Sequence, residues 1–368
     1  FTATGLTAAT TYHWGLQVDG QLITPVGAFR TAPPAAASFS FCVSGDSGGR
    51  SSRGPYIRSL QTANTPGYDL VVARDPDFFL FLGDQHYRDP TNEIPTEHLR
   101  HHRDVYDNPR AAAMFHALAV GHMWDDHDFT GDSADASATG RDVAVDVFRR
   151  ANPVLDGQYL VDAAPLDPVG YTFTWGRARF IITDHRSAQD RASSPRSHLG
   201  PAQQAAVVNL IETATEPVIF LHVGTPWISS GGSSADDWGA FTEDRAEIAE
   251  AIEAHAKGRV IIMHTDAHMI AADDGTNSQY ADSEDPGPPV WCHAPIGSGT
   301  SHKGGPYTEG MIPAVADSEP IYIQYAEIDV DDQGSQIVVT WHAWSDTEDE
   351  LGETEVMTQQ YTVPVGGD

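Results

Sequence analysis

Residues 78–87 read FFLFLGDQHY, and this stretch decides the fold expected for the chain. Five consecutive apolar residues are typical of a strand that is buried on both faces of a sheet. Gly83 lets the backbone turn sharply, so Asp84 leaves the sheet at the carboxyl end of the strand, where open α/β sheets place their ligands. Tyr87 follows closely enough to serve the same ion. The stretch therefore predicts a strand that delivers a carboxylate and a phenol to a metal ion.

The same arrangement recurs twice elsewhere in the chain. Residues 39–43 (FSFCV) lead to Asp46, and residues 260–263 (VIIM) lead to Asp266 and His268. Packing alone does not require metal-binding groups at the ends of three apolar strands. We therefore expect these strand ends to converge on one site.

The composition of the chain is strongly acidic. Its 368 residues carry 52 acidic and 21 basic side chains, a formal net charge of −31, and only Lys257 and Lys303 are lysines. Such a surface suits a salt-rich medium, although an ordinary solvated acidic face explains it equally well. In either case the charge argues against duplex nucleic acid or an anionic membrane as the main partner. No run of about 18 apolar residues is present, so no transmembrane segment is expected.

Cysteine usage gives little guidance. Cys42 and Cys292 are too few for a disulfide framework, and either one bridge or two free thiols would fit. Cys42 lies inside an expected strand, so we interpret it as a buried structural residue rather than as a ligand.

Residues 1–34 are expected to form a short β segment of their own. Residues 11–18 alternate apolar and polar side chains, and Asp19-Gly20 then leads into a second strand. Residues 32–37 (APPAAA) have the composition of a linker.

Residues 35–368 are expected to form the catalytic domain. Apolar strands alternate there with helical spacing at 202–213 and 242–256, and strands from about 319 to the end complete the domain. This order predicts an α/β fold, a four-layer α/β/β/α sandwich with mixed sheets. The irregular stretch 271–310 is long enough to be a lid or binding loop.

The candidate ligands combine carboxylate, phenol and imidazole groups, a mixture that suits hard and borderline cations. Carboxylates packed this closely would repel each other unless cations lay among them. Two ions about 3.5–4 Å apart that share one carboxylate could clamp both oxygens of a phosphoryl displacement. In chain order the candidate metal ligands are Asp46, Asp84, Tyr87, Asp126, His222, Asp266 and His268.

This ordered set resembles the calcineurin-like metallophosphatases, and within them the PhoD-like alkaline phosphatase/phosphodiesterase family. The resemblance covers roughly residues 38–275, and residues 1–34 resemble the tail of a fibronectin type III-like domain, which PhoD-like proteins often carry. The matching stretches are 78–87, 124–129 (WDDHDF), 180–186 (FIITDHR), 199–203 (LGPAQ), 225–227 (TPW), 237–245 and 266–268 (DAH).

The resemblance implies a role for each ligand. Asp84 would bridge two ions, expected to be Fe³⁺ and Ca²⁺, with Zn²⁺, Mn²⁺ or Mg²⁺ as alternatives. The first ion would take Asp46, Tyr87 and His268 as further ligands, and the second would take Asp126 and Asp266. His222 ends an apolar strand and could be either a ligand or a core histidine.

The resemblance also implies catalytic residues. His127 would stabilise or protonate the leaving oxygen, with Asp128 or Asp125 orienting it. Arg186 would contact the substrate phosphate, although pairing with Asp184 is equally compatible with the sequence. A metal-bound hydroxide would attack phosphorus in line.

The expected function is therefore that of a secreted or cell-surface hydrolase of phosphoric esters, a PhoD-like alkaline phosphatase. A phosphodiesterase or phospholipase D-like hydrolase is the alternative enzyme, and a catalytically silent, secreted metal-binding module is the alternative without activity. Residues 45–49 (GDSGG) also spell a serine-protease signature, but only His13 precedes them, so a protease is not expected.

Overall fold

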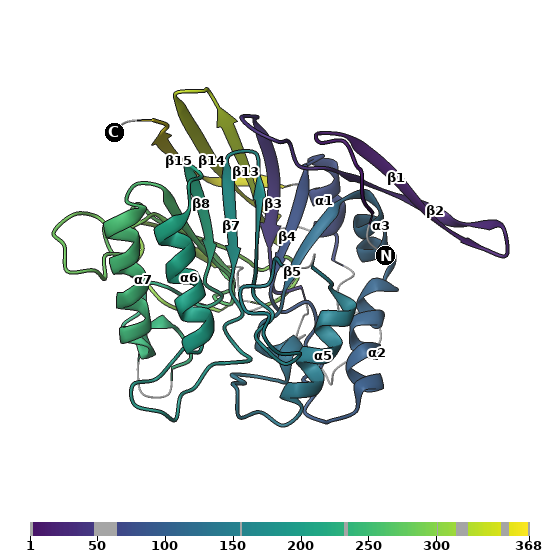
Figure 1. Cartoon of the computed structure of the whole chain (residues 1–368), viewed down its shortest axis with the longest axis horizontal. Helices are drawn as coiled ribbons and strands as arrows, with labels where there is room; N and C mark the ends of the chain where they lie inside the picture. The colour runs from purple at the N-terminus through teal and green to yellow at the C-terminus, as the bar shows by residue number, and fades with distance from the viewer. Residues whose placement is uncertain are drawn as a thin grey trace.

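The computed structural model describes residues 3–47, 65–154, 157–231, 235–299, 301–313, 323–346 and 353–366. Two large β-sheets pack against each other, and helices lie on their outer sides (Figure 1). In these ranges, no helix combines the length and the apolar character needed to cross a bilayer.

The first sheet has six strands in the order β15-β14-β13-β3-β4-β5. Its β3, β4 and β5 are parallel, and the three C-terminal strands join them as an antiparallel meander. The strand bounds are β3 (Phe39–Ser44), β4 (Phe78–Leu82), β5 (Ala119–Met123), β13 (Ile323–Asp332), β14 (Gln336–Asp346) and β15 (Thr354–Pro364).

The second sheet has seven strands in the order β12-β10-β11-β9-β8-β7-β6. Strands β7, β8, β9 and β11 are parallel, whereas β6, β10 and β12 pair antiparallel with their neighbours. The strand bounds are β6 (Tyr171–Trp175), β7 (Ala178–Ile182), β8 (Val218–His222), β9 (Val260–His264), β10 (Met269–Asp273), β11 (Val290–His293) and β12 (Glu309–Pro313).

Most of the helices cover the outer faces of the two sheets, whereas α5 adds Ala144, Val145 and Phe148 to the core between the sheets (Figure 1). Residues of α6 and α7 pack on the second sheet, and residues of α1, α2 and α3 pack on the first. The order of layers is therefore α/β/β/α, as expected. The helix bounds are α1 (Gly67–Ala73), α2 (Pro95–Tyr106), α3 (Pro109–Ala117), α4 (Asp126–Phe129), α5 (Arg141–Ala151), α6 (Pro201–Thr213), η1 (Trp238–Ala240) and α7 (Thr242–His255).

The β4 strand is buried on both faces, as its five apolar residues predict. Phe78, Leu80 and Leu82 belong to the core between the sheets, while Phe79 and Phe81 belong to the core beneath the helices. Because neighbouring side chains of a strand point to opposite faces, each face contributes to a different layer. Cys42 and Cys292 are both buried and free, so the alternative of a disulfide is wrong.

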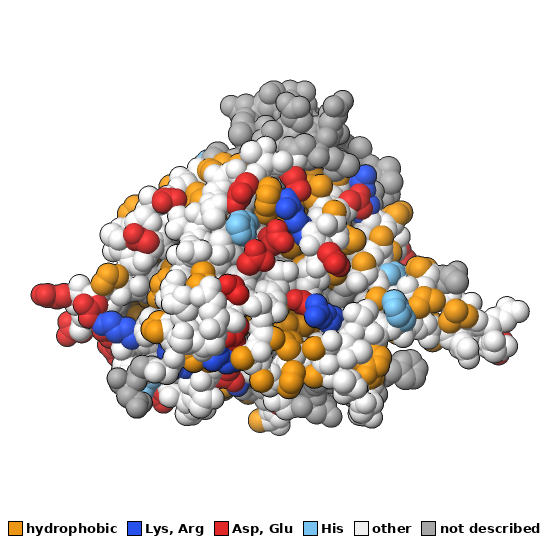
Figure 2. All heavy atoms as spheres, turned by 90° about the horizontal axis from the view of Figure 1, so that it is seen from above, with side chains coloured by type: hydrophobic (Ala, Val, Ile, Leu, Met, Phe, Trp, Pro, Cys, Tyr) orange, Lys and Arg blue, Asp and Glu red, His pale blue; other side chains and the backbone are white. Residues whose placement is uncertain are grey.

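Residues 11–30 form a separate antiparallel hairpin of β1 (Thr11–Val18) and β2 (Gln21–Arg30), which projects from one side of the molecule (Figure 1). The ring of Trp14 stacks on His116 of α3 at 5.4 Å between ring centroids. Apolar side chains are visible along the projecting hairpin in Figure 2. The hairpin agrees with the expected β segment, and its origin in a fibronectin type III-like domain stays a prediction.

Candidate functional site

Strand ends from both sheets meet at one edge of the sandwich. Asp46 and Asp84 follow β3 and β4, and the backbone N–H of Asp46 donates to the carbonyl of Gly83 at 2.9 Å. From the second sheet, the Thr265 hydroxyl donates to the Leu82 carbonyl at 2.6 Å, which brings the segment after β9 against the end of β4. The expected convergence of these strands is therefore present.

The backbone at this edge is held in an uncommon conformation. A positive φ is unfavourable for residues other than glycine, and such strain concentrates at functional sites because surrounding contacts must maintain it. Four of the expected ligands have this conformation: Asp46 (56°), Asp84 (54°), Asp266 (62°) and His268 (48°).

The first group of potential ligands contains Asp46, Asp84 and His268, whose ligand atoms all lie within 4.8 Å of one another. The Tyr87 hydroxyl lies 3.3 Å from Asp46 Oδ1 and 3.0 Å from His268 Nε2. The structure thus brings together the four side chains that the sequence placed at the first ion. Asp46 and Asp84 are almost completely buried.

The second group contains Asp84, Asp126 and His127, again with ligand atoms within 4.8 Å of one another. Asp126 starts α4 directly after β5, and its Oδ2 accepts a hydrogen bond from the Ser133 N–H at 2.6 Å. Asp84 belongs to both groups, which is the arrangement required of a carboxylate that bridges two cations.

The protonation states and unpaired atoms at this edge fit bound cations. Burial, followed by the charges of Asp126 and Asp125, raises the pKa of Asp84 well above its usual range. Nearby, Asp125 Oδ2 and Asp266 Oδ2 are buried without a hydrogen-bond partner. Cations would compensate Asp84 and Asp266, and the oxygen and imidazole donors suit hard or borderline ions.

The orientation of His268 also fits a metal ligand. Its Nδ1 lies 2.6 Å from the carbonyl oxygen of Gly299, so Nδ1 carries the proton and donates it there. In the neutral ring the lone pair is then on Nε2, the nitrogen that faces Asp46 and Tyr87. Metal-binding histidines are commonly fixed in this way by a hydrogen bond from the second ring nitrogen.

Asp266 lies at the site but outside both groups. Its backbone N–H donates to Asp46 Oδ2 at 3.3 Å, and its Oδ1 accepts from Lys303 Nζ at 2.6 Å. The expected role of Asp266 as a ligand of the second ion therefore depends on its other oxygen, Oδ2. Sequence reasoning missed Lys303, and the scarcity of lysine was the only signal that could have identified it.

The Arg186 guanidinium is completely buried beside the second group. Its Nε donates to Asp125 Oδ1 at 2.6 Å, and its Nη1 donates to Asp236 Oδ2 at 2.8 Å. The Nη2 atom lies 3.8 Å from Asp126 Oδ2 and has no hydrogen-bond partner. The guanidinium therefore keeps one buried amino group, at Nη2, without a hydrogen-bond partner.

The alternative pairing of Arg186 with Asp184 is wrong for the side chain. The Asp184 carboxylate accepts from the backbone N–H of Arg186 at 3.0 Å and from Trp124 Nε1 at 2.8 Å. Asp184 therefore fixes the turn after β7, and Asp125 and Asp236 are the partners of the guanidinium.

His127 is oriented by a residue that the sequence did not indicate. Its Nδ1 lies 2.6 Å from Asp89 Oδ1. Burial alone would lower the pKa of His127, but Asp89 and Asp126 outweigh this effect and raise it. The expectation that Asp125 or Asp128 orients this ring is wrong.

The Asp128 carboxylate is used for helix capping instead. It accepts from the backbone N–H of Asp125 at 2.6 Å and of Gln85 at 2.9 Å, and it forms a capping box at the start of α4. These bonds direct the carboxylate toward the backbone rather than the His127 ring. Asp128 therefore positions the turn that follows Asp84, and its expected catalytic role is not supported by this geometry.

His222 belongs to neither group of ligand atoms among the described residues. It is the last residue of β8, is completely buried, and has its ring centroid 5.9 Å from that of His185. Burial, and then the charge of His185, lowers the pKa of His222. Both of its ring nitrogens are buried without a hydrogen-bond partner, so both interpretations offered by the sequence stay open.

Residues in the second half of the stretch 271–310 contact the candidate metal site at several points. The Gly297 N–H donates to the Asp46 carbonyl at 3.2 Å, and Gly299 binds His268 as described above. Lys303 binds Asp266, and the Tyr307 hydroxyl lies 3.1 Å from His264 Nε2. The expectation that 271–310 is irregular throughout is wrong, because the end of β10, all of β11 and the start of β12 lie within it. Residues 297–299 and 301–307 nevertheless border the site, as expected of a binding loop.

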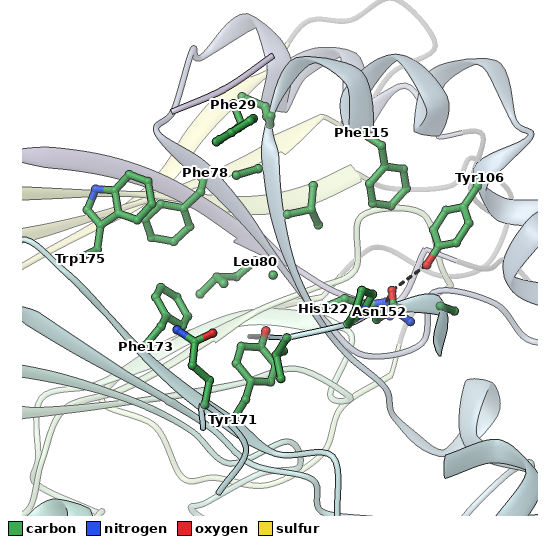
Figure 3. Close-up of a pocket in the computed structure, with 18 residues that line it drawn as sticks. Phe29, Phe78, Leu80, Tyr106, Phe115, His122, Asn152, Tyr171, Phe173 and Trp175 are labelled. Atoms are coloured by element: carbon green, nitrogen blue, oxygen red, sulfur yellow. Dashed lines mark hydrogen bonds between the residues drawn. The ribbon is translucent and has the colours of Figure 1, made fainter. Parts of the chain in front are cut away.

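A separate cavity of about 660 Å³ lies between the sheets beside β5 and β6 (Figure 3). At one end, the Tyr106 hydroxyl donates to Asn152 Oδ1 at 2.7 Å, and His122 Nδ1 lies 2.9 Å from the same oxygen. The remaining lining is mainly apolar but includes Gln158 and Tyr171, and none of the candidate ligands lines the cavity. Its apolar lining includes Phe29, Phe78, Leu80, Phe115, Phe173 and Trp175.

Comparison with known proteins identifies the fold but gives no match from sequence. No family model matches the chain, and no curated protein matches it. Among solved structures, PhoD has a TM-score of 0.73 and 17% sequence identity, with 98% of this chain and 77% of PhoD covered. The chain therefore has the metallophosphatase-type sandwich fold, and its resemblance to PhoD is confirmed at the level of the fold.

Two further solved structures match with low scores. Vps29 from Chaetomium thermophilum has a TM-score of 0.30 and 11% identity, covering 89% of this chain and 97% of that chain. A protein described as a 5'-nucleotidase from Staphylococcus aureus has a TM-score of 0.40 and 13% identity, covering 90% of this chain and 55% of that chain. The assignment of the fold rests on PhoD.

Proposed function

We propose that the chain is a metal-dependent phosphoesterase that hydrolyses phosphate esters at a pair of cations, as a PhoD-like alkaline phosphatase. The observation that carries this proposal is the position of Asp84, which belongs to both groups of ligand atoms at the edge of a PhoD-like fold. When bound, the cations would neutralise charge on the phosphoryl group and acidify a water molecule.

The ligands divide between two positions. Asp46, Tyr87 and His268 would hold the first cation together with Asp84, and the phenol favours Fe³⁺ there. Asp126 would hold the second cation, for which the oxygen donors favour Ca²⁺. Zn²⁺, Mn²⁺ and Mg²⁺ are the alternatives that metal analysis would distinguish.

Two cationic side chains would act on the substrate. Arg186 would donate its unpaired Nη2 to a phosphate oxygen, since a guanidinium edge matches phosphate geometry. His127, held at Nδ1 by Asp89, would use its other nitrogen to protonate the leaving oxygen. Both roles require the turn after β5 to keep its present conformation.

The test is hydrolysis of p-nitrophenyl phosphate and of bis(p-nitrophenyl) phosphate by the purified full chain, with metal analysis of the same sample. We expect at least one tightly bound ion per chain and turnover of the monoester. Preferential turnover of the diester would favour the phosphodiesterase alternative. Calcium-dependent stability without turnover of either ester would favour a silent metal-binding module, and a colourless active enzyme would contradict Fe³⁺ beside Tyr87.

We also propose that the protein acts outside the cytoplasm, as a secreted or cell-surface enzyme. This proposal is supported only by the resemblance to PhoD-like proteins. Fractionation of the producing cells tests it, because recovery of the protein from the cytoplasm alone would contradict it.

A further inference from the structure

The chain has only two lysines, and they lie in different surroundings. Lys257 follows the C-terminus of α7, where its Nζ donates to Glu253 Oε1 at 2.7 Å and also pairs with Asp285. Lys303 instead donates to Asp266 Oδ1 at 2.6 Å, at the edge that holds the candidate metal ligands. In a chain with a net charge of −31, a lysine at this position needs a specific explanation.

The loop that carries Lys303 is packed against the second sheet. The N–H of Gly305 donates to the carbonyl of Ile228 at 2.7 Å. Gly304 has a φ of 78°, and a Cβ atom there would lie 2.6 Å from the same carbonyl oxygen, so only glycine fits this close approach. Tyr307 fixes the next part of the loop through His264. Lys303 is thus held in place by its neighbours in the chain.

The Lys303 side chain is partly exposed, and its ammonium group binds the buried Asp266. Its side chain is 41% exposed, whereas that of Asp266 is only 4% exposed. Asp266 therefore holds the ammonium group from the inner side. An ammonium group has three N–H donors, and the bond to Asp266 uses one of them.

Lys303 pairs with Asp266, and Arg186 pairs with Asp125 and Asp236. The charges of Asp126, Asp236 and Asp266 influence both cationic groups. Arg186 has one buried amino group, Nη2, without a hydrogen-bond partner, and the Lys303 ammonium has donors beyond the one that binds Asp266. Two cationic donors that share a set of carboxylates form a pair that an anion with several oxygens could bridge.

We propose that Lys303 binds the phosphoryl group of the substrate and makes the site selective for phosphate monoesters over diesters. This inference rests on the proposed phosphoesterase function and names its substrate class. A monoester presents three non-bridging oxygens and carries a second negative charge near neutral pH. A diester presents two such oxygens and one charge. Lys303 binds the third non-bridging oxygen and the second negative charge of the monoester, both of which a diester lacks.

The test compares K303M and K303R with K257M, using the metal-loaded full chain. We expect K303M to lower kcat/KM for p-nitrophenyl phosphate by about 10- to 100-fold, the range for losing a hydrogen bond to a charged group. For bis(p-nitrophenyl) phosphate we expect little change. K303R should retain most of the monoester activity because it keeps the charge, and K257M should behave as the wild type. Equal losses on both esters, or no loss on either, would overturn the proposal.

A binding measurement keeps this inference separate from the proposed function. If the wild type turns over neither ester, the proposed phosphoesterase function fails, and inorganic phosphate then serves as the probe in isothermal titration calorimetry. Weaker phosphate binding by K303M, but not by K257M, would support the role of Lys303. Equal binding by the two variants would overturn it. Because Lys303 is partly exposed, an unchanged melting temperature should show that K303M is folded.

Discussion

The candidate site has two halves, one around Asp46 and Asp84 and the other around Asp125 and Asp266. The negative charge of each half is neutralised in a different way. In the part of the chain that the structure describes, no lysine or arginine forms an ion pair with Asp46 or Asp84. In the other half, Arg186 pairs with Asp125, and Lys303 pairs with Asp266. In the described residues the first half therefore has only the His268 ring as a titratable cation beside Asp46, whereas arginine and lysine partly neutralise the second half.

The pKa shifts of two carboxylates express the same difference. Burial and neighbouring carboxylates raise the pKa of Asp84 well above its usual range. Burial also acts to raise the pKa of Asp125, but Arg186 and His185 outweigh it and hold that pKa well below its usual range. Equally buried carboxylates thus titrate in opposite directions because only one of them has a protein cation beside it.

The largest effect is expected from D84N, which removes the carboxylate shared by both groups. We expect kcat/KM for a phosphate ester to fall by at least about 10³-fold, since several kcal/mol of cation-based stabilisation would be lost. Metal analysis should show a lower ion content than in the wild type. D19N is the matched control, because Asp19 is exposed in the hairpin and has a similar φ of 51°. Retention of both activity and metal by D84N would contradict the shared-carboxylate role.

D89N tests the second half through His127. Removing the charge beside His127 Nδ1 should lower kcat by about 10- to 100-fold, as expected for a misoriented or less basic general acid. KM and metal content should change little. The basic limb of the pH profile of kcat should also move to lower pH in D89N, because Asp89 raises the pKa of His127. An unchanged pH profile would show that Asp89 does not act through His127.

D236N should have a smaller effect in the same half. Arg186 would lose its ionic partner at Nη1 but keep the bond from Nε to Asp125. We expect KM for a phosphate ester to change by about 3- to 10-fold with kcat nearly constant, the range for one weakened hydrogen bond. A loss of bound metal from D236N would show instead that the two halves are not independent.

The smallest effect concerns stability without metal. A raised native pKa means that Asp84 stabilises the metal-free fold when protonated, and this contribution is lost as the pH rises through the native pKa. In a chelator, D84N should therefore be more stable than the wild type at pH 8, by about 1 kcal/mol or more. The difference should vanish toward pH 4. Denaturant unfolding at both pH values measures it, and a less stable D84N at pH 8 would contradict the crowding of carboxylates.

Much of the architecture could be predicted because it depends on local patterns. The uninterrupted apolar run of β4 required burial on both faces, and the helical spacing in α6 and α7 required one buried stripe. Asp46 and Asp84 could be placed together because parallel strands bring their carboxyl ends to one edge of a sheet. His268 follows a strand of the other sheet, and the family resemblance placed it beside them. The sequence thus determined the layers and the part of the first half that belongs to the first sheet.

The partners in the second half were decided only by the tertiary structure. Asp89 and His127 are 38 residues apart, Asp125 and Arg186 are 61 apart, and Asp266 and Lys303 are 37 apart. Asp128 is adjacent to His127 in sequence, yet helix capping directs its carboxylate elsewhere. Strand burial and turn chemistry follow from neighbouring residues, whereas the choice of ionic partner depends on how separate loops pack against one another.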